Sequence, residues 1–232
     1  MLKNPFKQLK KQDYILWIVS LLVVSISSLF SKETSPITFT ATIIGVTALI
    51  FTAGGDVWGQ ILIIFFSILY AINSYVFCYY GEMITYLGMT LPIAVISIVT
   101  WLKHPFSSEK NEVKIHRLNN KDKLIMVLLA IFVTTAFYFI LKALNTANLL
   151  FSTISITTSF LAAYLSMRRS SWYAIAYAAN DIVLIVLWVS ASIKDFSYFP
   201  MVICFIVFLV NDFYGYSKWK KREKRQRAKI FD

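Results

Sequence analysis

A carboxylate, Asp181, lies near the middle of the otherwise apolar run 172–191, and Asn180 directly precedes it. Helical spacings of three and four residues place Asp181 on one stripe with four other side chains: Tyr173, Tyr177, Leu184 and Trp188. Aromatic faces beside a hydrogen-bond acceptor suit a flat heterocycle that carries a sugar, because rings stack on the base and a carboxylate accepts hydroxyl protons. The stripe therefore predicts a site for a nucleoside-like small molecule.

Weaker candidates for the same site lie in other apolar runs. Asn73 and Asn211 are amides that either contact substrate or hold helices together, at roughly 1–2 kcal/mol per hydrogen bond. Trp172 fits an aromatic belt at the membrane interface as well as a ligand contact, as do Trp58 and Trp219. The predicted substrate-binding residues are Asp181, Asn180, Tyr177, Trp188, Asn73, Tyr70, Tyr86, Asn211 and Trp172.

Asp181 has three possible roles: binding ligand, carrying a proton, or joining helices. A second ionisable group deep in an apolar run is not evident from the sequence, so facilitated diffusion is simpler than proton coupling. His104 and His116 lie in a polar loop without a ligand set, and no phosphate-binding glycine loop or serine elbow occurs. We expect no catalytic residue, metal or cofactor.

The elements that must position these residues are membrane-spanning helices. The chain is 58% hydrophobic and only 15% charged, which is too apolar for a water-soluble domain of this size. About 20 apolar residues cross the hydrocarbon core as a helix. Eight stretches meet this requirement: 14–30, 37–53, 57–77, 83–102, 124–143, 149–167, 172–191 and 198–217. The fold class is therefore an all-α polytopic membrane protein.

The basic residues predict the orientation. With the N-terminus in the cytoplasm, all of them lie on the cytoplasmic side except Lys32, Lys142 and Lys194, and Lys3 belongs to the cytoplasmic group. Both termini are therefore expected in the cytoplasm, with the protein in a bacterial inner membrane. This distribution explains the net charge of +11 without a nucleic-acid partner.

Aligning Trp58 with Trp172 reveals a weak internal repeat of three spans. Each block starts with a Thr/Ser-rich span and continues with a Trp-led span and an aromatic-rich span. A 3+1+3 layout gives the blocks one orientation, as in sugar transporters of the SWEET type. The predicted divisions are 1–36 (basic segment and peripheral helix), 37–102 (first repeat), 103–148 (cytoplasmic loop and linker helix), 149–219 (second repeat) and 220–232 (basic tail).

The chain resembles the PnuC family of bacterial vitamin and nucleoside transporters over almost everything after the first span. The first block carries this resemblance through Trp58-Gly59, Tyr70, Asn73, Tyr75, Tyr80-Gly81-Glu82, Pro92 and Trp101. The second block carries it through Arg168-Arg169, Trp172, Asp181 and the ending Gly215-Tyr216-Ser217-Lys218-Trp219-Lys220-Lys221. The resemblance implies a homotrimer that takes up nicotinamide riboside by facilitated diffusion, with a cytoplasmic kinase trapping the substrate by phosphorylation.

The chain departs from the family pattern at pocket positions. Ala94 stands where the resemblance implies a Gln, and Ser97-Ile98 stand where it implies a Gly-Trp pair. A second-block tryptophan pair is present only as Trp172 and Tyr177. A deoxynucleoside or thiamine therefore stays open as the substrate. A non-transporting membrane enzyme or assembly factor, with the basic loop as a docking site, is the alternative of another class.

Overall fold

The computed structural model describes residues 4–29, 36–76, 80–107, 110–146 and 148–231. Lys3 and Lys32, which enter the charge argument, lie outside these ranges. The helices are α1 (Lys11–Leu29), α2 (Pro36–Ala53), α3 (Val57–Val76), α4 (Tyr80–Thr85), α5 (Leu91–Lys103), α6 (Asn120–Ala143), α7 (Leu149–Met167), α8 (Tyr173–Lys194) and α9 (Phe199–Phe231). Short 3₁₀ turns occur at Phe6–Gln8 and Phe196–Tyr198.

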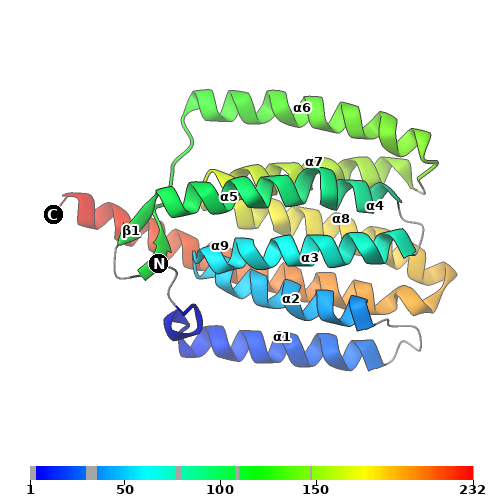
Figure 1. Cartoon of the computed structure of the whole chain (residues 1–232), viewed down its shortest axis with the longest axis horizontal. Coiled ribbons are helices and arrows are strands. Elements are labelled where there is room, and N and C mark those ends of the chain that lie inside the picture. Colours follow the sequence, from blue (N-terminus) through cyan, green and yellow to red (C-terminus); the bar gives the residue numbers. More distant parts are fainter. Residues whose placement is uncertain (1–3, 30–35, 77–79, 108–109, 147, 232) are drawn as a thin grey trace.

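Eight helical segments of the described chain are long and apolar enough to cross a membrane. One of them, Gly81–Lys103, is composite: α4 continues through a π-helical segment, Tyr86–Thr90, into α5. The long helices run side by side along one axis (Figure 1). The prediction of an all-α polytopic membrane protein with eight spans is confirmed.

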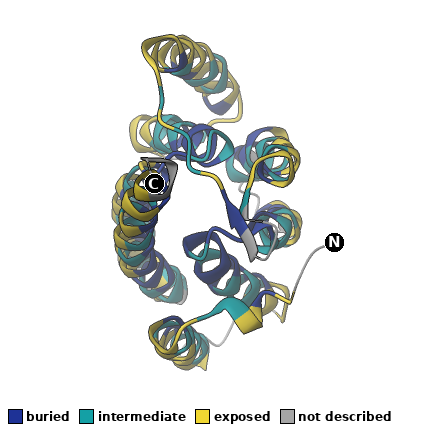
Figure 2. Ribbon diagram, turned by 90° about the vertical axis from the view of Figure 1, so that its left-hand side faces the viewer, coloured by how far each residue is buried: buried dark blue, intermediate teal, exposed yellow. Residues whose placement is uncertain are grey.

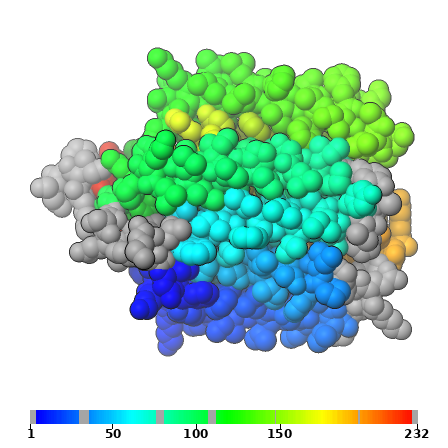
Figure 3. Space-filling view, viewed as in Figure 1, coloured from blue at the N-terminus to red at the C-terminus, as the bar shows by residue number. Residues whose placement is uncertain are grey.

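The outermost helices of the bundle are α1 and α6. Helix α1 packs against α2 and α9 at one edge, and α6 packs against α7 at the opposite edge (Figures 1 and 2). Their outward faces expose large apolar side chains, such as Leu22 and Phe132. Figure 3 shows α1 along the lower edge and α6 along the upper edge of the molecule. In water this exposure would be costly, whereas lipid covers it.

Helices α2 and α3 approach each other closely because position 59 has no side chain. A Cβ atom on Gly59 would lie 2.5 Å from the backbone nitrogen of Thr52. Real Cβ atoms do not come so near a backbone atom, so any larger residue would push the two helices apart. Thr52 lines the central cavity described below, and Gly59 therefore helps to set the shape of that cavity.

Two features at the end of the bundle that carries the termini differ from the sequence prediction (Figure 1). The expected polar loop contains an antiparallel hairpin, β1 (Pro105–Ser107) and β2 (Lys110–Val113), and Val113 N donates to the Gly55 carbonyl at 3.1 Å. Helix α9 runs on through the segment predicted as a separate tail, 220–232, as far as Phe231. The parallel repeat of 37–102 and 149–219 stays a prediction, with α2 to α5 in one block and α7 to α9 in the other.

Candidate functional site

A cavity of about 80 Å³ lies in the middle of the bundle, and we call it the central cavity. Helices α2, α3, α7, α8, α9 and the π-helical segment contribute its walls. Among the described residues, its lining is aromatic and aliphatic apart from a few polar groups and two acidic residues, Asp181 and Asp212, and it includes no Lys or Arg. An apolar cavity with a few converging polar groups is the usual form of a small-molecule site.

Asp181 of α8 and Asp212 of α9 form the acidic wall of the central cavity. Their side chains lie in direct contact and are only 3% and 4% exposed. The Oδ2 atom of Asp181 has no hydrogen-bond partner in the described part of the chain. The expectation that Asp181 lacks a second ionisable partner is therefore wrong. A buried carboxyl oxygen without a partner is available to a ligand.

The amide of Asn180 is held in place by hydroxyl groups of α7. Its Oδ1 accepts from Thr158 Oγ1 at 2.8 Å, Ser159 Oγ at 3.0 Å and Ser155 Oγ at 3.3 Å. Three hydroxyl donors on one oxygen leave the side chain little freedom to turn, so the amide is fixed where it borders the cavity. The hydroxyl groups of the Ser/Thr-rich helix α7 thus fix the orientation of a side chain of α8.

An aromatic cluster forms another part of the cavity wall. The ring centroids of Tyr70 and Tyr86 are 4.4 Å apart, and Phe66 lies 5.5 Å from Tyr70 and 5.8 Å from Tyr86. Phe66 and Tyr86 line the central cavity, and the π-helical segment that starts at Tyr86 also brings Thr90 there. Such π-helical insertions in α-helices are frequent at functional sites.

Tyr70 and Asn73 lie next to the central cavity rather than in its wall. Both line a small neighbouring cavity of about 10 Å³ that also borders Phe66. Tyr70 donates to Glu82 Oε2 at 2.7 Å, and Asn73 Oδ1 accepts from Thr38 at 2.6 Å. Tyr70 and Asn73 could therefore contact a ligand in the central cavity only if the ring of Phe66, which borders both cavities, moved.

Three of the predicted site residues lie away from the central cavity. Trp172 is 52% exposed, with its ring centroid 5.7 Å from that of Tyr216. Trp188 is buried, with its ring 5.8 Å from Tyr198. Asn211 donates to Ser20 Oγ of α1 at 2.9 Å, so it faces the peripheral helix. None of these three residues belongs to the wall of the central cavity.

The sequence analysis chose Asn211 on α9, whereas other residues of that helix line the cavity. Phe205, Phe208 and Asp212 all line the cavity, and their spacings of three and four residues put them on one helical face. Asn211 lies about 100° further round the helix and points elsewhere. The same stripe argument that identified Asp181 would have favoured Asp212 over Asn211.

The end of the central cavity nearer the termini is closed by buried aromatic rings. Tyr173, which lines the cavity, lies 4.8 Å from the ring of Trp219, and Trp219 lies 5.6 Å from that of Trp101. The indole nitrogens of Trp101 and Trp219 donate to the carbonyls of Ser166 and Thr52, each at 2.9 Å. Trp219 is 0% exposed, so its interpretation as an interface belt residue is wrong.

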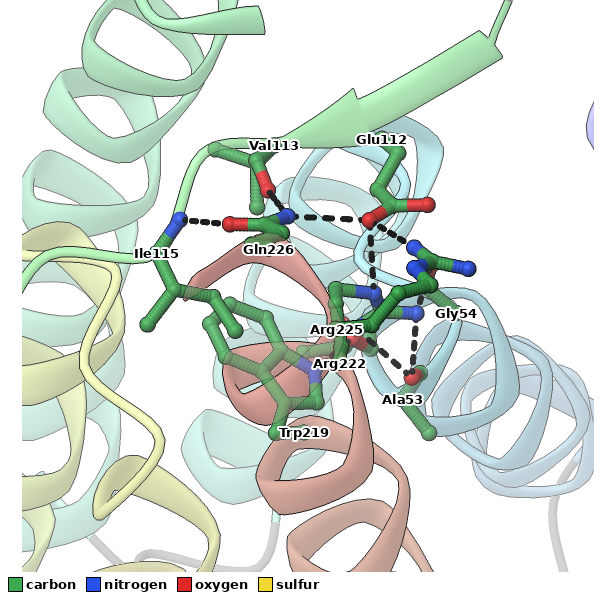
Figure 4. A network of polar contacts seen from close by, with 10 residues as sticks. Ala53, Gly54, Glu112, Val113, Ile115, Trp219, Arg222, Arg225 and Gln226 are labelled. Atoms are coloured by element: carbon green, nitrogen blue, oxygen red, sulfur yellow. Dashed lines mark hydrogen bonds and ion pairs between the residues drawn. The ribbon is translucent and has the colours of Figure 1, made fainter. Parts of the chain in front are cut away.

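A polar network lies beyond these rings and ties α9 to the hairpin (Figure 4). Glu112 accepts hydrogen bonds from Arg225 and from Gln226, the latter at 2.9 Å, and Arg222 Nε lies 3.4 Å away. Arg222 also donates to the carbonyl of Gly54 at 2.5 Å. Burial raises the pKa of Glu112, but the hydrogen bonds and guanidinium charges outweigh it and hold this pKa below the ordinary 4.5.

A second cavity of about 50 Å³, the outer cavity, continues from the central one towards the opposite end of the bundle. It shares Tyr86, Ser159 and Leu184 with the central cavity and reaches Gly81 at the start of the α4–α5 span and Thr146 between α6 and α7. The polar groups that line it include Glu82 and Ser155. The two cavities follow one another along the bundle, and packed rings close the end nearer the termini, which is the form of a path across a membrane.

Eight membrane-spanning helices around a partly polar central cavity define a polytopic membrane transporter. The sequence model of the family described as nicotinamide mononucleotide transporter matches residues 35–221, and the chain belongs to that family. Membership favours a transporter over the non-transporting enzyme or assembly factor that the sequence left open.

Two known proteins show the extent of the similarity. The nicotinamide riboside transporter PnuC of Neisseria mucosa is 25% identical over 213 residues, which cover 90% of this chain and 81% of that protein. A crystal structure of the vitamin B3 transporter PnuC has the same fold, with a TM-score of 0.80 at 23% identity and 94% of each chain covered.

Proposed function

We propose that the protein takes up nicotinamide riboside through the central cavity by facilitated diffusion. The observation that carries the proposal is the contact between Asp181 and Asp212 in a cavity otherwise lined by aromatic and apolar groups. The nicotinamide ring of this nucleoside bears a permanent positive charge. Aromatic faces and carboxylates both attract such a cation, and carboxylates also accept protons from the ribose hydroxyls.

The charge of the cavity separates the candidate substrates. Thiamine is also cationic and stays the second candidate, whereas a deoxynucleoside is neutral and would leave the acidic pair without a counter-charge. The phosphate of nicotinamide mononucleotide would be repelled by the acidic pair, and none of the lining residues in the described part of the chain is a Lys or Arg that could bind it. The cavity thus favours the nucleoside over its nucleotide.

The proposed path runs from the outer cavity to the central cavity and then past the rings of Tyr173, Trp219 and Trp101. At about 80 Å³ and 50 Å³ the two cavities are far smaller than the roughly 300–1,000 Å³ of typical ligand sites. Substrate entry therefore requires the surrounding helices to move apart. Release at the other end requires the three rings to separate, and the Glu112 network opposes that separation.

Further parts of the proposal concern the cellular setting. Both termini face the cytoplasm of a bacterium, as the distribution of Lys and Arg predicts. Three copies form a homotrimer in the inner membrane, each with its own path. A cytoplasmic kinase phosphorylates the nucleoside and so keeps its free concentration low, which draws more substrate inward without coupling to an ion gradient.

Calorimetric titration of the purified protein tests the substrate assignment. Nicotinamide riboside should bind most tightly, thiamine less tightly, and nicotinamide mononucleotide and the deoxynucleosides weakest. Asp181→Asn should weaken binding, and Asp195→Asn, at an exposed carboxylate beyond the end of α8, serves as its matched control. Tighter binding of a neutral deoxynucleoside, or no binding of either cation, would overturn the proposal.

A further inference from the structure

A third cavity, of about 520 Å³, lies at the end of the bundle that carries both termini. Its walls come from the segment before α1, the turn between α2 and α3, and the last part of α9. Of the residues that the structure describes, none lines both this cavity and the central cavity. Its basic lining residues are Lys7, Lys10, Lys218, Lys221, Arg222 and Arg225, and we call it the basic cavity.

Half of these cations are already paired with carboxylates of the protein. Lys218 Nζ lies 2.6 Å from Asp13 Oδ1, and Arg222 and Arg225 both pair with Glu112. Asp56 adds one more negative charge to the lining. Positive charge therefore remains in excess inside a concave site.

The remaining three cations, Lys7, Lys10 and Lys221, have no carboxylate partner in the part of the chain that the structure describes. Lys7 and Lys10 come from the segment before α1, whereas Lys221 comes from α9. They therefore reach the cavity from two parts of the chain far apart in sequence. Such convergence on one hollow lets several cations act on a single anion.

An unused hydrogen-bond donor points to the same conclusion. Gln8 lines the basic cavity, and its amide nitrogen is buried without a hydrogen-bond partner in the described chain. A buried donor without a partner costs free energy, so such groups commonly contact a ligand, an ion or ordered water. An anion with several acceptor oxygens would satisfy this donor and the lysines together.

We propose that the basic cavity binds the phosphate group of an anion. Phosphate oxygens accept from lysine ammonium groups and from an amide, which are the donors that converge here. The cavity lies where the apolar part of α9 gives way to its basic end, which is the level of lipid headgroups. The phosphate can thus come from an anionic phospholipid or from a free phosphate compound in solution.

Two triple variants with equal loss of charge test this site. Lys7→Gln, Lys10→Gln and Lys221→Gln together remove the unpaired cations of the cavity. Lys121→Gln, Lys123→Gln and Lys224→Gln together remove three exposed lysines that do not line it. The melting temperature of each full-length protein in neutral detergent is measured against short-chain phosphatidylglycerol, short-chain phosphatidylcholine, and inorganic phosphate at constant ionic strength.

The wild type should be stabilised by phosphatidylglycerol but not by phosphatidylcholine if the source is lipid, and by inorganic phosphate if the source is soluble. In either case the cavity variant should bind that probe at least tenfold more weakly, as expected from about 1 kcal/mol per lysine. The control variant should respond like the wild type. The proposal is overturned if neither probe stabilises the wild type, or if both triple variants lose the response equally.

The single variant Lys221→Gln guards against a general effect of the triple substitution. It should weaken binding of the effective probe by several-fold with the same melting temperature in the absence of probe. An unchanged affinity in this variant, together with an unchanged affinity in the triple variant, would also exclude the site.

Discussion

Asp181 and Asp212 come from neighbouring helices, α8 and α9, and their side chains touch at the wall of a cavity otherwise built from rings and aliphatic groups. Two acidic groups in such a place are expensive to bury, and a structure keeps them only where something opposes the cost. A cationic ligand in this cavity would offset the cost of burial by pairing with the acidic groups and by contact with the aromatic cluster.

Asp181→Asn and Asp212→Asn should each weaken the binding of nicotinamide riboside by roughly 10- to 100-fold, because a hydrogen bond to a charged group contributes about 1.5–3 kcal/mol. Both substitutions keep the shape of the side chain. Calorimetric titration measures the effect, and Asp195→Asn should leave the affinity as in the wild type. Equal affinities in all four proteins would reduce the pair to a contact between helices.

Tyr86→Ala should weaken binding by about tenfold or more, whereas Tyr86→Phe should have little effect. The ring faces the cavity from the π-helical segment, and an aromatic face gains on the order of 1–2 kcal/mol from a desolvated cation. The phenylalanine variant keeps that face and loses only the hydroxyl. A loss of affinity as large in Tyr86→Phe as in Tyr86→Ala would show that the hydroxyl, and not the ring, recognises the ligand.

Trp172→Ala and Asn211→Ala should leave the affinity for nicotinamide riboside unchanged, because both side chains lie outside the central cavity. Asn211→Ala should nevertheless lower the stability by about 1 kcal/mol, since it breaks the hydrogen bond to Ser20 that joins α9 to α1. Thermal unfolding and titration of the same preparations separate the two effects. A large loss of affinity in Trp172→Ala would place the substrate nearer the surface than we propose.

Gly59→Ala should destabilise the protein by about 1–3 kcal/mol, because the added methyl group meets the Thr52 backbone. Gly88→Ala is the matched control, since the nearest atom to a Cβ there is 4.0 Å away. Melting temperatures in one detergent compare the two variants. If the two variants have the same melting temperature, the close approach of α2 and α3 does not depend on this glycine.

Glu112 should make the stability depend on pH in the acid range. Its pKa is lowered in the folded protein, so its contribution is fully present above the unfolded value near 4.5 and is lost as the pH falls further. Glu112→Gln should therefore melt below the wild type at neutral pH, and the gap should narrow on acidification below about pH 4.5. If the difference in melting temperature between the two proteins stays constant down to about pH 3, the charge of Glu112 contributes little to the stability.

The sequence allowed the eight spans to be predicted because each is a long apolar run, and hydropathy depends on local composition alone. It also allowed Asp181 to be singled out, because a carboxylate inside such a run needs an explanation wherever the helix lies. Tyr177 followed from its helical spacing to Asp181, whereas Asn180 was named as the neighbour of Asp181 and Tyr86 as a candidate from another span; the structure brings all three to the cavity that Asp181 lines.

What could not be predicted depends on contacts between distant segments. The hairpin of Pro105–Ser107 and Lys110–Val113 is too short and polar to give a strand pattern, and it is held by Gly55 and Gln226. The continuation of α9 past residue 220 likewise rests on Glu112 and Ile115, which its side chains contact from more than one hundred residues away. Tertiary contacts of this kind leave no local signal.

Uptake of labelled nicotinamide riboside into proteoliposomes is the most direct test of facilitated transport through this cavity. We predict that the label inside reaches the concentration outside and no more, regardless of an imposed pH gradient, and rises above it only when a nucleoside kinase and ATP are enclosed. Asp181→Asn should slow this uptake, while Asp195→Asn should not. Accumulation driven by the pH gradient without the kinase, or the absence of uptake above that of empty liposomes, would contradict the account.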